Sequence, residues 1–182
     1  MILSRQDKFA LDLHSLKTYV EALRKLLRLG RGNFNVCCVG DREIRKLNSA
    51  HLGRSWPTDV LAFPWLENKS GSLARSRRAR GLRSGRRMRG SSWNNRSRGE
   101  FRNFLGDIVI SVETARRNAR VEGHSLKTEV RWLVLHGLLH LLGHDHDADH
   151  GEMTALELSL RDRLKKPRMS GRKTSERGAR NV

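Results

Sequence analysis

The segment from His136 to His146, with the sequence HGLLHLLGHDH, constrains this chain more than any other part of it. His136 and His140 are four residues apart, so on a helix they project from the same face, one turn apart. Gly143 can adopt the left-handed conformation that ends many helices, which lets the chain turn back and present His146. Three histidines at this spacing can bind zinc and leave one tetrahedral position open, which is typical of a catalytic zinc site.

The residues around these histidines predict a buried helix. Leucine, valine and tryptophan fill most other positions from Trp132 to Leu142, so the helix is apolar on nearly all sides. Histidines inside such a helix need partners, and their spacing favours a metal ion. The third ligand is less constrained than the first two. Besides His146, the loop contains His144, His150, Asp145, Asp147 and Asp149.

One class of zinc enzyme is excluded at once. Zinc peptidases with the motif H-E-x-x-H carry their general base directly after the first histidine. In this chain that position is Gly137. The side chain that would activate water for peptide hydrolysis is therefore absent.

Three sequence blocks together resemble the YbeY family, single-domain bacterial and organellar endoribonucleases that act on ribosomal RNA. Residues 136–146 match every fixed position of the family pattern H-G-x-L-H-L-x-G-x-D-H. Residues 57–64 (PTDVLAFP) resemble P-T-D-V-L-S-F-P, with Ala62 in place of serine, and residues 105–111 (LGDIVIS) resemble L-G-D-I-x-I-S. The blocks occur in the family order, and the resemblance covers roughly residues 33–67 and 104–160.

The resemblance implies a zinc-dependent, single-strand-specific endoribonuclease. Its role would lie in ribosomal RNA maturation, at the 3′ end of 16S rRNA, and in ribosome quality control. It implies one Zn²⁺ ion per chain, with His136, His140 and His146 as ligands, and the small ribosomal subunit and its proteins as partners.

Further candidate site residues lie in the other two blocks. Thr58 and Asp59 are candidate substrate-binding residues and Asp107 is a candidate catalytic residue, because polar residues at strand ends often line sites. The alternative for Thr58 and Asp59 is a turn or cap that holds the start of a strand. The alternative for Asp107 is a structural hydrogen bond.

The chain departs from the family just before the P-T-D block. The family carries an arginine there, whereas the aligned residues here are His51 and Leu52. Arg54, two positions on, is the candidate catalytic residue that would stabilise charge on the phosphate. If no arginine serves this role, the alternative is a non-catalytic ribosome-biogenesis factor that binds RNA and has a structural zinc.

The positive charge of the chain is concentrated in two segments. The net charge is +18, of which residues 68–103 carry +11 and residues 161–182 carry +7, so residues 1–67 and 104–160 are neutral. We interpret the neutral part as a single domain, residues 68–103 as a basic disordered insert, and residues 161–182 as the end of the last helix and a basic disordered tail. Such basic segments favour binding to RNA, and the alternative is that they are solvated segments without a function.

The hydrophobic periodicity predicts an α+β fold: a small mixed sheet packed with several helices in one domain, with the zinc site at the end of a buried helix. The predicted helices cover residues 15–29, 41–48, 112–121, 126–142 and 151–165, with Asp41 and Ser111 as N-caps. The predicted strands cover residues 33–39, 59–63 and 107–111, the last in a central position, with an edge strand at Ile2 and Leu3.

The remaining signals concern the compartment. Cys37 and Cys38 are adjacent in a predicted strand, where they point to opposite faces, so a disulfide between them would be strained. We find no signal peptide and no apolar stretch of the roughly 20 residues that a membrane helix needs. These features favour a cytoplasmic protein that has no membrane partner.

Overall fold

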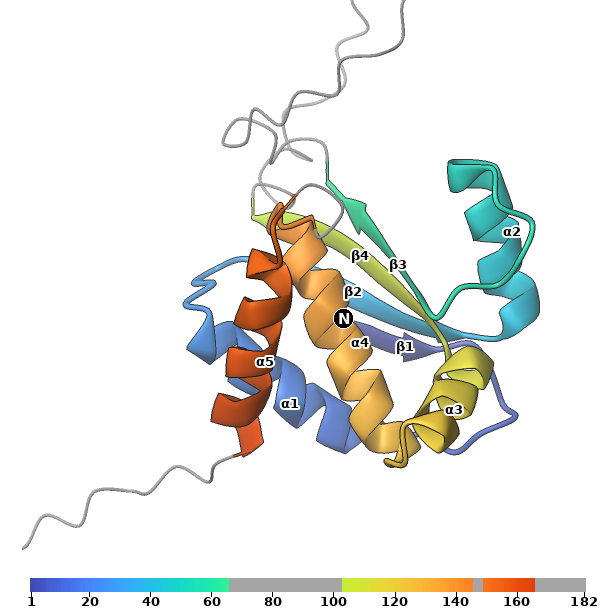
Figure 1. Ribbon diagram of the computed structural model, residues 1–182, viewed down its shortest axis with the longest axis horizontal. Coiled ribbons are helices and arrows are strands. Elements are labelled where there is room, and N and C mark those ends of the chain that lie inside the picture. Colours follow the sequence, from blue (N-terminus) through green and yellow to red (C-terminus); the bar gives the residue numbers. More distant parts are fainter. Residues whose placement is uncertain (66–102, 146–148, 166–182) are drawn as a thin grey trace, which may run out of the picture.

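The computed structural model describes residues 1–65, 103–145 and 149–165 (Figure 1). Its strands are β1 (Ile2–Ser4), β2 (Asn33–Val39), β3 (Val60–Pro64) and β4 (Phe104–Ser111), and its helices are α1 (Leu13–Leu26), α2 (Asp41–Leu52), α3 (Val112–Val121), α4 (Leu126–Leu141) and α5 (Glu152–Lys165). The strands form one sheet in the order β1-β2-β4-β3. β1, β2 and β4 are parallel, and β3 is antiparallel to β4. The predicted α+β fold with a mixed sheet and a central β4 is confirmed.

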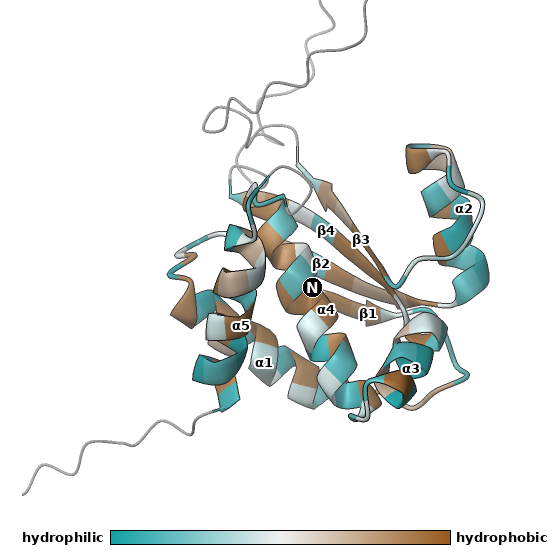
Figure 2. Cartoon of the chain, viewed as in Figure 1, coloured by the Kyte–Doolittle hydropathy of each residue, from teal (hydrophilic) through white to brown (hydrophobic). Residues whose placement is uncertain are grey.

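The two faces of the sheet are covered unequally. Figure 1 shows α1, α4 and α5 on one side of the sheet and α2 on the other. Ile108 and Ile110 of β4 belong to the large core under α1, α3, α4 and α5, whereas Val109 between them packs with Ile44 of α2. This alternation follows from the two-residue repeat of a strand. Figure 2 shows the resulting hydrophobic colouring of β3 and β4.

The helix α4 is buried, as predicted, and it approaches the sheet closely. Ser125 accepts the N–H of Thr128 at 3.1 Å and so caps its start, and Gly143, with a φ of 93°, follows its end. A Cβ atom on Gly137 would lie 2.8 Å from Cγ2 of Ile108. Close packing against Ile108 therefore explains why residue 137, directly after the first histidine, is a glycine.

Three predicted helix details are wrong, each for a local reason. Gly40, not Asp41, is the N-cap of α2, and the Asp41 N–H donates instead to Glu113 Oε2 at 2.6 Å. The same helix continues to Leu52 because Gly53, in the left-handed region, is its C-cap. α1 begins at Leu13, since Asp12 accepts the Ser15 N–H at 2.9 Å, and it ends at Leu26.

Other details are confirmed. Ser111 caps α3 by accepting the Thr114 N–H at 3.3 Å. Cys37 and Cys38 point to opposite faces of the sheet and both are free thiols. Among the helices of the described ranges, none is long and apolar enough to cross a bilayer.

Candidate metal centre

The two described histidines of the predicted zinc site lie side by side on α4. His136 Nε2 and His140 Nε2 are 3.1 Å apart, and the two rings meet edge to face with centroids 4.8 Å apart. Two nitrogens that bind one tetrahedral zinc ion at about 2.0–2.1 Å are about 3.3 Å apart. The pair therefore fits a shared ion in both separation and donor type.

The last helix orients the first histidine through Glu157. His136 Nδ1 lies 3.1 Å from Glu157 Oε2, and the Arg161 guanidinium donates to the other carboxylate oxygen. Burial raises the pKa of Glu157, but the hydrogen bonds from His136 and Arg161 and the charge of Arg161 outweigh burial, so its pKa lies below the usual value. An ionised Glu157 holds a proton on Nδ1 and leaves Nε2 as the nitrogen that can bind a metal ion.

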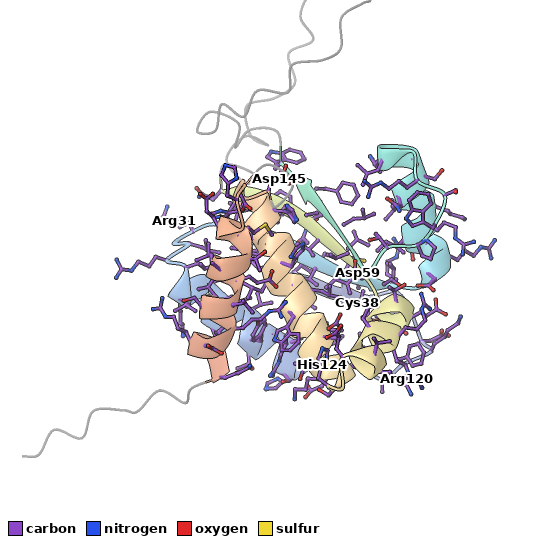
Figure 3. The ribbon with its side chains drawn as sticks, in the orientation of Figure 1. Arg31, Cys38, Asp59, Arg120, His124 and Asp145 are labelled. Carbon is purple, nitrogen blue, oxygen red and sulfur yellow. The ribbon has the colours of Figure 1, made fainter. Side chains whose placement is uncertain are left out.

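A pocket with a volume of about 400 Å³ lies along α4, between α3, the start of β3 and α5. In Figure 3, Asp59 lies between α4 and α3 at the start of β3, and His124 lies at the lower end of α4. The polar side chains that line the pocket are Asp59, Asn118, Glu122, His124, Glu129, His136, Glu157 and Arg161. The oriented histidine is thus part of a site lined mostly by polar side chains.

An acid–histidine pair forms another part of this pocket. His124 Nε2 lies 3.1 Å from Glu129 Oε2, although the contact is not aligned as a hydrogen bond. The imidazole packs edge-on against Trp132, with ring centroids 4.4 Å apart. Burial raises the pKa of Glu129, and the charge of His124 and a hydrogen bond from Asn118 offset it only in part. A partly desolvated carboxyl group therefore shares the pocket with His136.

Of the two predicted substrate-binding residues, Asp59 lines the pocket. Its Oδ2 accepts from Asn118 Nδ2 at 3.2 Å, and its Oδ1 accepts from the Val60 N–H at 2.9 Å. The Thr58 hydroxyl donates to the same Oδ1 at 3.1 Å. Asp59 thus both holds the start of β3, which was the structural alternative, and faces the site. Thr58 does not line the pocket, and its hydroxyl group helps to hold Asp59 in place.

The two predicted catalytic residues are not among the residues that line the pocket. Asp107 Oδ1 accepts from Asn35 Nδ2 at 2.8 Å, a contact that joins neighbouring positions of β2 and β4. Arg54 is exposed just beyond α2. Leu52, at the position of the family arginine, is 57% exposed. Catalytic roles for Arg54 and Asp107 therefore stay predictions from the sequence.

The third ligand is also still a prediction. His146 lies outside the described residues, as do Asp147 and nearly all of the basic insert and the tail. Within residues 1–65, 103–145 and 149–165, no group of three histidine, cysteine or acidic side chains is arranged to hold a metal ion. Asp149, one of the alternatives, accepts the N–H groups of Gly151 and Met153 at 2.8 and 2.7 Å and so caps the start of α5.

The sequence contained signals for residues that our prediction missed. Glu157 is a charged residue four positions from the buried Met153, on the side of α5 that packs inward. Glu129 lies seven positions before His136, two turns back on the same face of α4. An acidic residue at helical spacing from a predicted ligand or from a predicted core residue is a signal of this kind, although its partner cannot be read from the sequence.

The comparisons with known proteins agree with these observations. The family model described as Endoribonuclease YbeY matches residues 2–165. The chain is 35% identical to Endoribonuclease YbeY of Koribacter versatilis, over 92% of this chain and 87% of that protein. It is 31% identical to Endoribonuclease YbeY of Syntrophus aciditrophicus, over 85% and 79% of the two chains. The solution structure of a Thermotoga maritima protein shares the fold, with a TM-score of 0.54, 24% identity and coverage of 90% and 89%.

Proposed function

The chain belongs to the Endoribonuclease YbeY family, and we propose that it is a zinc-dependent endoribonuclease that cleaves single-stranded RNA in ribosomal RNA maturation. We extend the proposal to the 3′ end of 16S rRNA as substrate, to ribosome quality control, to the small ribosomal subunit as partner and to the cytoplasm as location. The observation that carries the proposal is the 3.1 Å separation of His136 Nε2 and His140 Nε2 beside a polar pocket.

In this proposal, His136 and His140 hold the zinc ion through Nε2, and the family resemblance adds His146 as the third ligand. Zinc, when bound, supplies a Lewis acid for a phosphate oxygen and lowers the pKa of water toward about 7. Glu157 keeps the His136 imidazole in the required tautomer and orientation, and Arg161 keeps Glu157 ionised. These contacts fix the donor atoms before any ligand arrives.

Two acidic residues that line the pocket have the other proposed roles, substrate binding and proton exchange. Asp59 is the proposed substrate-binding residue, because it lines the pocket while Asn118 and Val60 hold its carboxylate in place. The carboxyl group of Glu129 lies in the same pocket with its pKa raised by burial, so it is a candidate to exchange a proton with RNA oxygens. His124 Nε2 lies 3.1 Å from this carboxyl group.

An RNA-cleavage assay tests the function. Intact protein and the His140→Ala variant are incubated with end-labelled single-stranded RNA, and zinc content is measured by elemental analysis. We expect His140→Ala to lose both zinc and cleavage. His14→Ala is the matched control, since His14 is an exposed histidine on α1. Cleavage by His140→Ala at the rate of the intact protein would refute the assignment.

One observation favours a second candidate function. Leu52 takes the place of the family arginine, and within the described chain no arginine lines the pocket except Arg161, which already binds Glu157. A non-catalytic RNA-binding factor of ribosome biogenesis with a structural zinc fits this departure. Leu52→Arg and Arg54→Ala discriminate the two candidates. A changed single-turnover cleavage rate in either variant supports the enzyme, and an intact protein that leaves RNA uncut supports the factor.

A further inference from the structure

A basic surface with one exposed aromatic ring lies on α2 and the loop that follows it. Arg42, Arg45 and Lys46 are exposed and share the helix face opposite the buried Ile44, and Arg54 and Trp56 are exposed in the loop. We call these five residues, Arg42, Arg45, Lys46, Arg54 and Trp56, the α2 surface. Within the described chain, none of its four cations forms an ion pair with an acidic side chain. Their charge is therefore available to an anionic partner.

The ring of Trp56 projects into solvent from a fixed backbone. The side chain of Asn48, which is 1% exposed, donates from Nδ2 to the Trp56 carbonyl at 2.8 Å. Gly53, with a φ of 68°, ends α2, and Pro57 restricts the backbone on the other side. Trp56 itself is 59% exposed. A large aromatic side chain is thus held at the surface without a partner in the described core.

The α2 surface comes close to the candidate site at Trp56. Trp56 is three residues before Asp59, which lines the pocket beside His136. An extended chain spans at most about 3.6 Å per residue, so the Cα atoms of Trp56 and Asp59 are at most about 11 Å apart. A nucleotide on the Trp56 ring would therefore lie within a few nucleotides of one in the pocket.

We propose that the α2 surface binds single-stranded RNA, with one base stacked on Trp56 and backbone phosphates on the neighbouring cations, and that it leads the strand into the pocket. This inference rests on the proposed function and names how its substrate is held. Cationic grooves with stacking aromatics are the usual means of binding single strands without sequence preference. A protein partner is the less favoured occupant, because the apolar exposure here is confined to Leu52 and Trp56.

Binding measurements on the full chain test the proposal. Fluorescence anisotropy of a short labelled single-stranded RNA is measured with Trp56→Leu, which keeps an apolar side chain but loses the ring, and with Trp56→Phe, which keeps a ring. Loss of one stacked base costs about 1–3 kcal/mol, so we expect Trp56→Leu to bind roughly 5- to 150-fold more weakly. Trp56→Phe should retain most of the affinity. Leu158→Ala, at a comparably exposed apolar position on α5, is the control and should bind like the intact protein.

Salt dependence and duplex RNA separate stacking from charge. Trp56→Leu should leave the slope of log affinity against log salt unchanged, because it removes no phosphate contact. An Arg45→Ala, Lys46→Ala double variant should flatten that slope. Duplex RNA, whose bases are already stacked, should bind Trp56→Leu, Trp56→Phe and the intact protein with equal affinity.

Three outcomes decide the question. Equal affinity of Trp56→Leu and intact protein for single-stranded RNA would overturn the inference, and if the intact protein still cuts RNA the proposed function survives. If Trp56→Leu lost as much affinity for duplex RNA as for single-stranded RNA, the inference would also be overturned, since base stacking would not be the cause. A Trp56-dependent affinity in a protein that cleaves no RNA would support the surface and refute the nuclease.

Discussion

Glu157 and His136 are 21 residues apart in the chain, yet Glu157 Oε2 lies 3.1 Å from His136 Nδ1. The contact joins α5 to α4, the helix that carries the two described histidines of the predicted zinc site. Any change that weakens it should act on the proposed metal centre from a second helix.

Replacing Glu157 should weaken zinc binding without removing a ligand. Loss of a carboxylate that orients a metal-binding histidine typically costs about 10–100-fold in metal affinity, and we expect this for Glu157→Gln. Chelator competition measures the affinity. Glu152→Gln, an exposed acid on the same helix, is the control and should bind zinc like the intact protein. Equal affinities in all three proteins would contradict the role of Glu157.

Asp41 should make the stability of the fold depend on acid pH. Burial raises its pKa, but hydrogen bonds from Ser111, Arg117 and Thr114 outweigh burial and lower the pKa below the usual value. A lowered folded-state pKa stabilises the fold fully above the unfolded pKa of about 3.9, and this stabilisation is lost as the pH falls through the folded value.

Asp41→Asn should therefore lower the free energy of unfolding by about 1.5–3 kcal/mol at neutral pH, the range for hydrogen bonds to charged groups. The difference from the intact protein should shrink below about pH 4. Urea denaturation at a series of pH values measures it, with Asp162→Asn, an exposed acid, as control. A difference that is constant down to the lowest pH would rule out this account.

Gly137→Ala should destabilise the protein although alanine is the better helix former. In an exposed helix the change stabilises by about 1 kcal/mol. Here the new methyl group would lie 2.8 Å from Ile108 Cγ2, and such overpacking typically costs about 1–3 kcal/mol. The sign of the change in unfolding free energy decides between the two effects. A stabilised variant would show that α4 can move away from β4 at little cost.

Deleting residues 68–102 should leave a folded, zinc-binding domain. β3 and β4 are antiparallel neighbours, Pro64 pairs with Gly106, and the Trp65 N–H donates to the Leu105 carbonyl at 2.9 Å, so the described residues on the two sides of the deletion lie next to each other. Asn103 is retained because its carbonyl accepts the Asn33 N–H at 2.8 Å. The slope of log RNA affinity against log salt should flatten, by about 0.7 for each lost phosphate contact. An unchanged slope would mean that the insert does not bind RNA.

The sequence predicted those parts of the site that depend on local spacing. The proximity of His136 and His140 follows from four-residue spacing on a helix, and the burial of that helix follows from its composition. The contact of Glu157 with His136 depends on how α5 packs, which no local pattern contains. The prediction of Asp41 as the N-cap of α2 was wrong for the same reason, because the carboxylate that accepts the Asp41 N–H belongs to Glu113, 72 residues away. The sequence could not predict which polar groups far apart in the chain would become hydrogen-bond partners.

The unequal cover of the sheet has a consequence for the dynamics of the α2 surface. On the α2 side only four described hydrophobic residues, Val39, Ile44, Leu61 and Val109, are buried together, whereas α4 lies within the large core. Elements with few buried contacts open at the lowest free energy, so the amide protons of α2 should exchange with solvent sooner than those of α4. The helix that presents the proposed RNA-binding residues is thus the one that an RNA ligand would protect most.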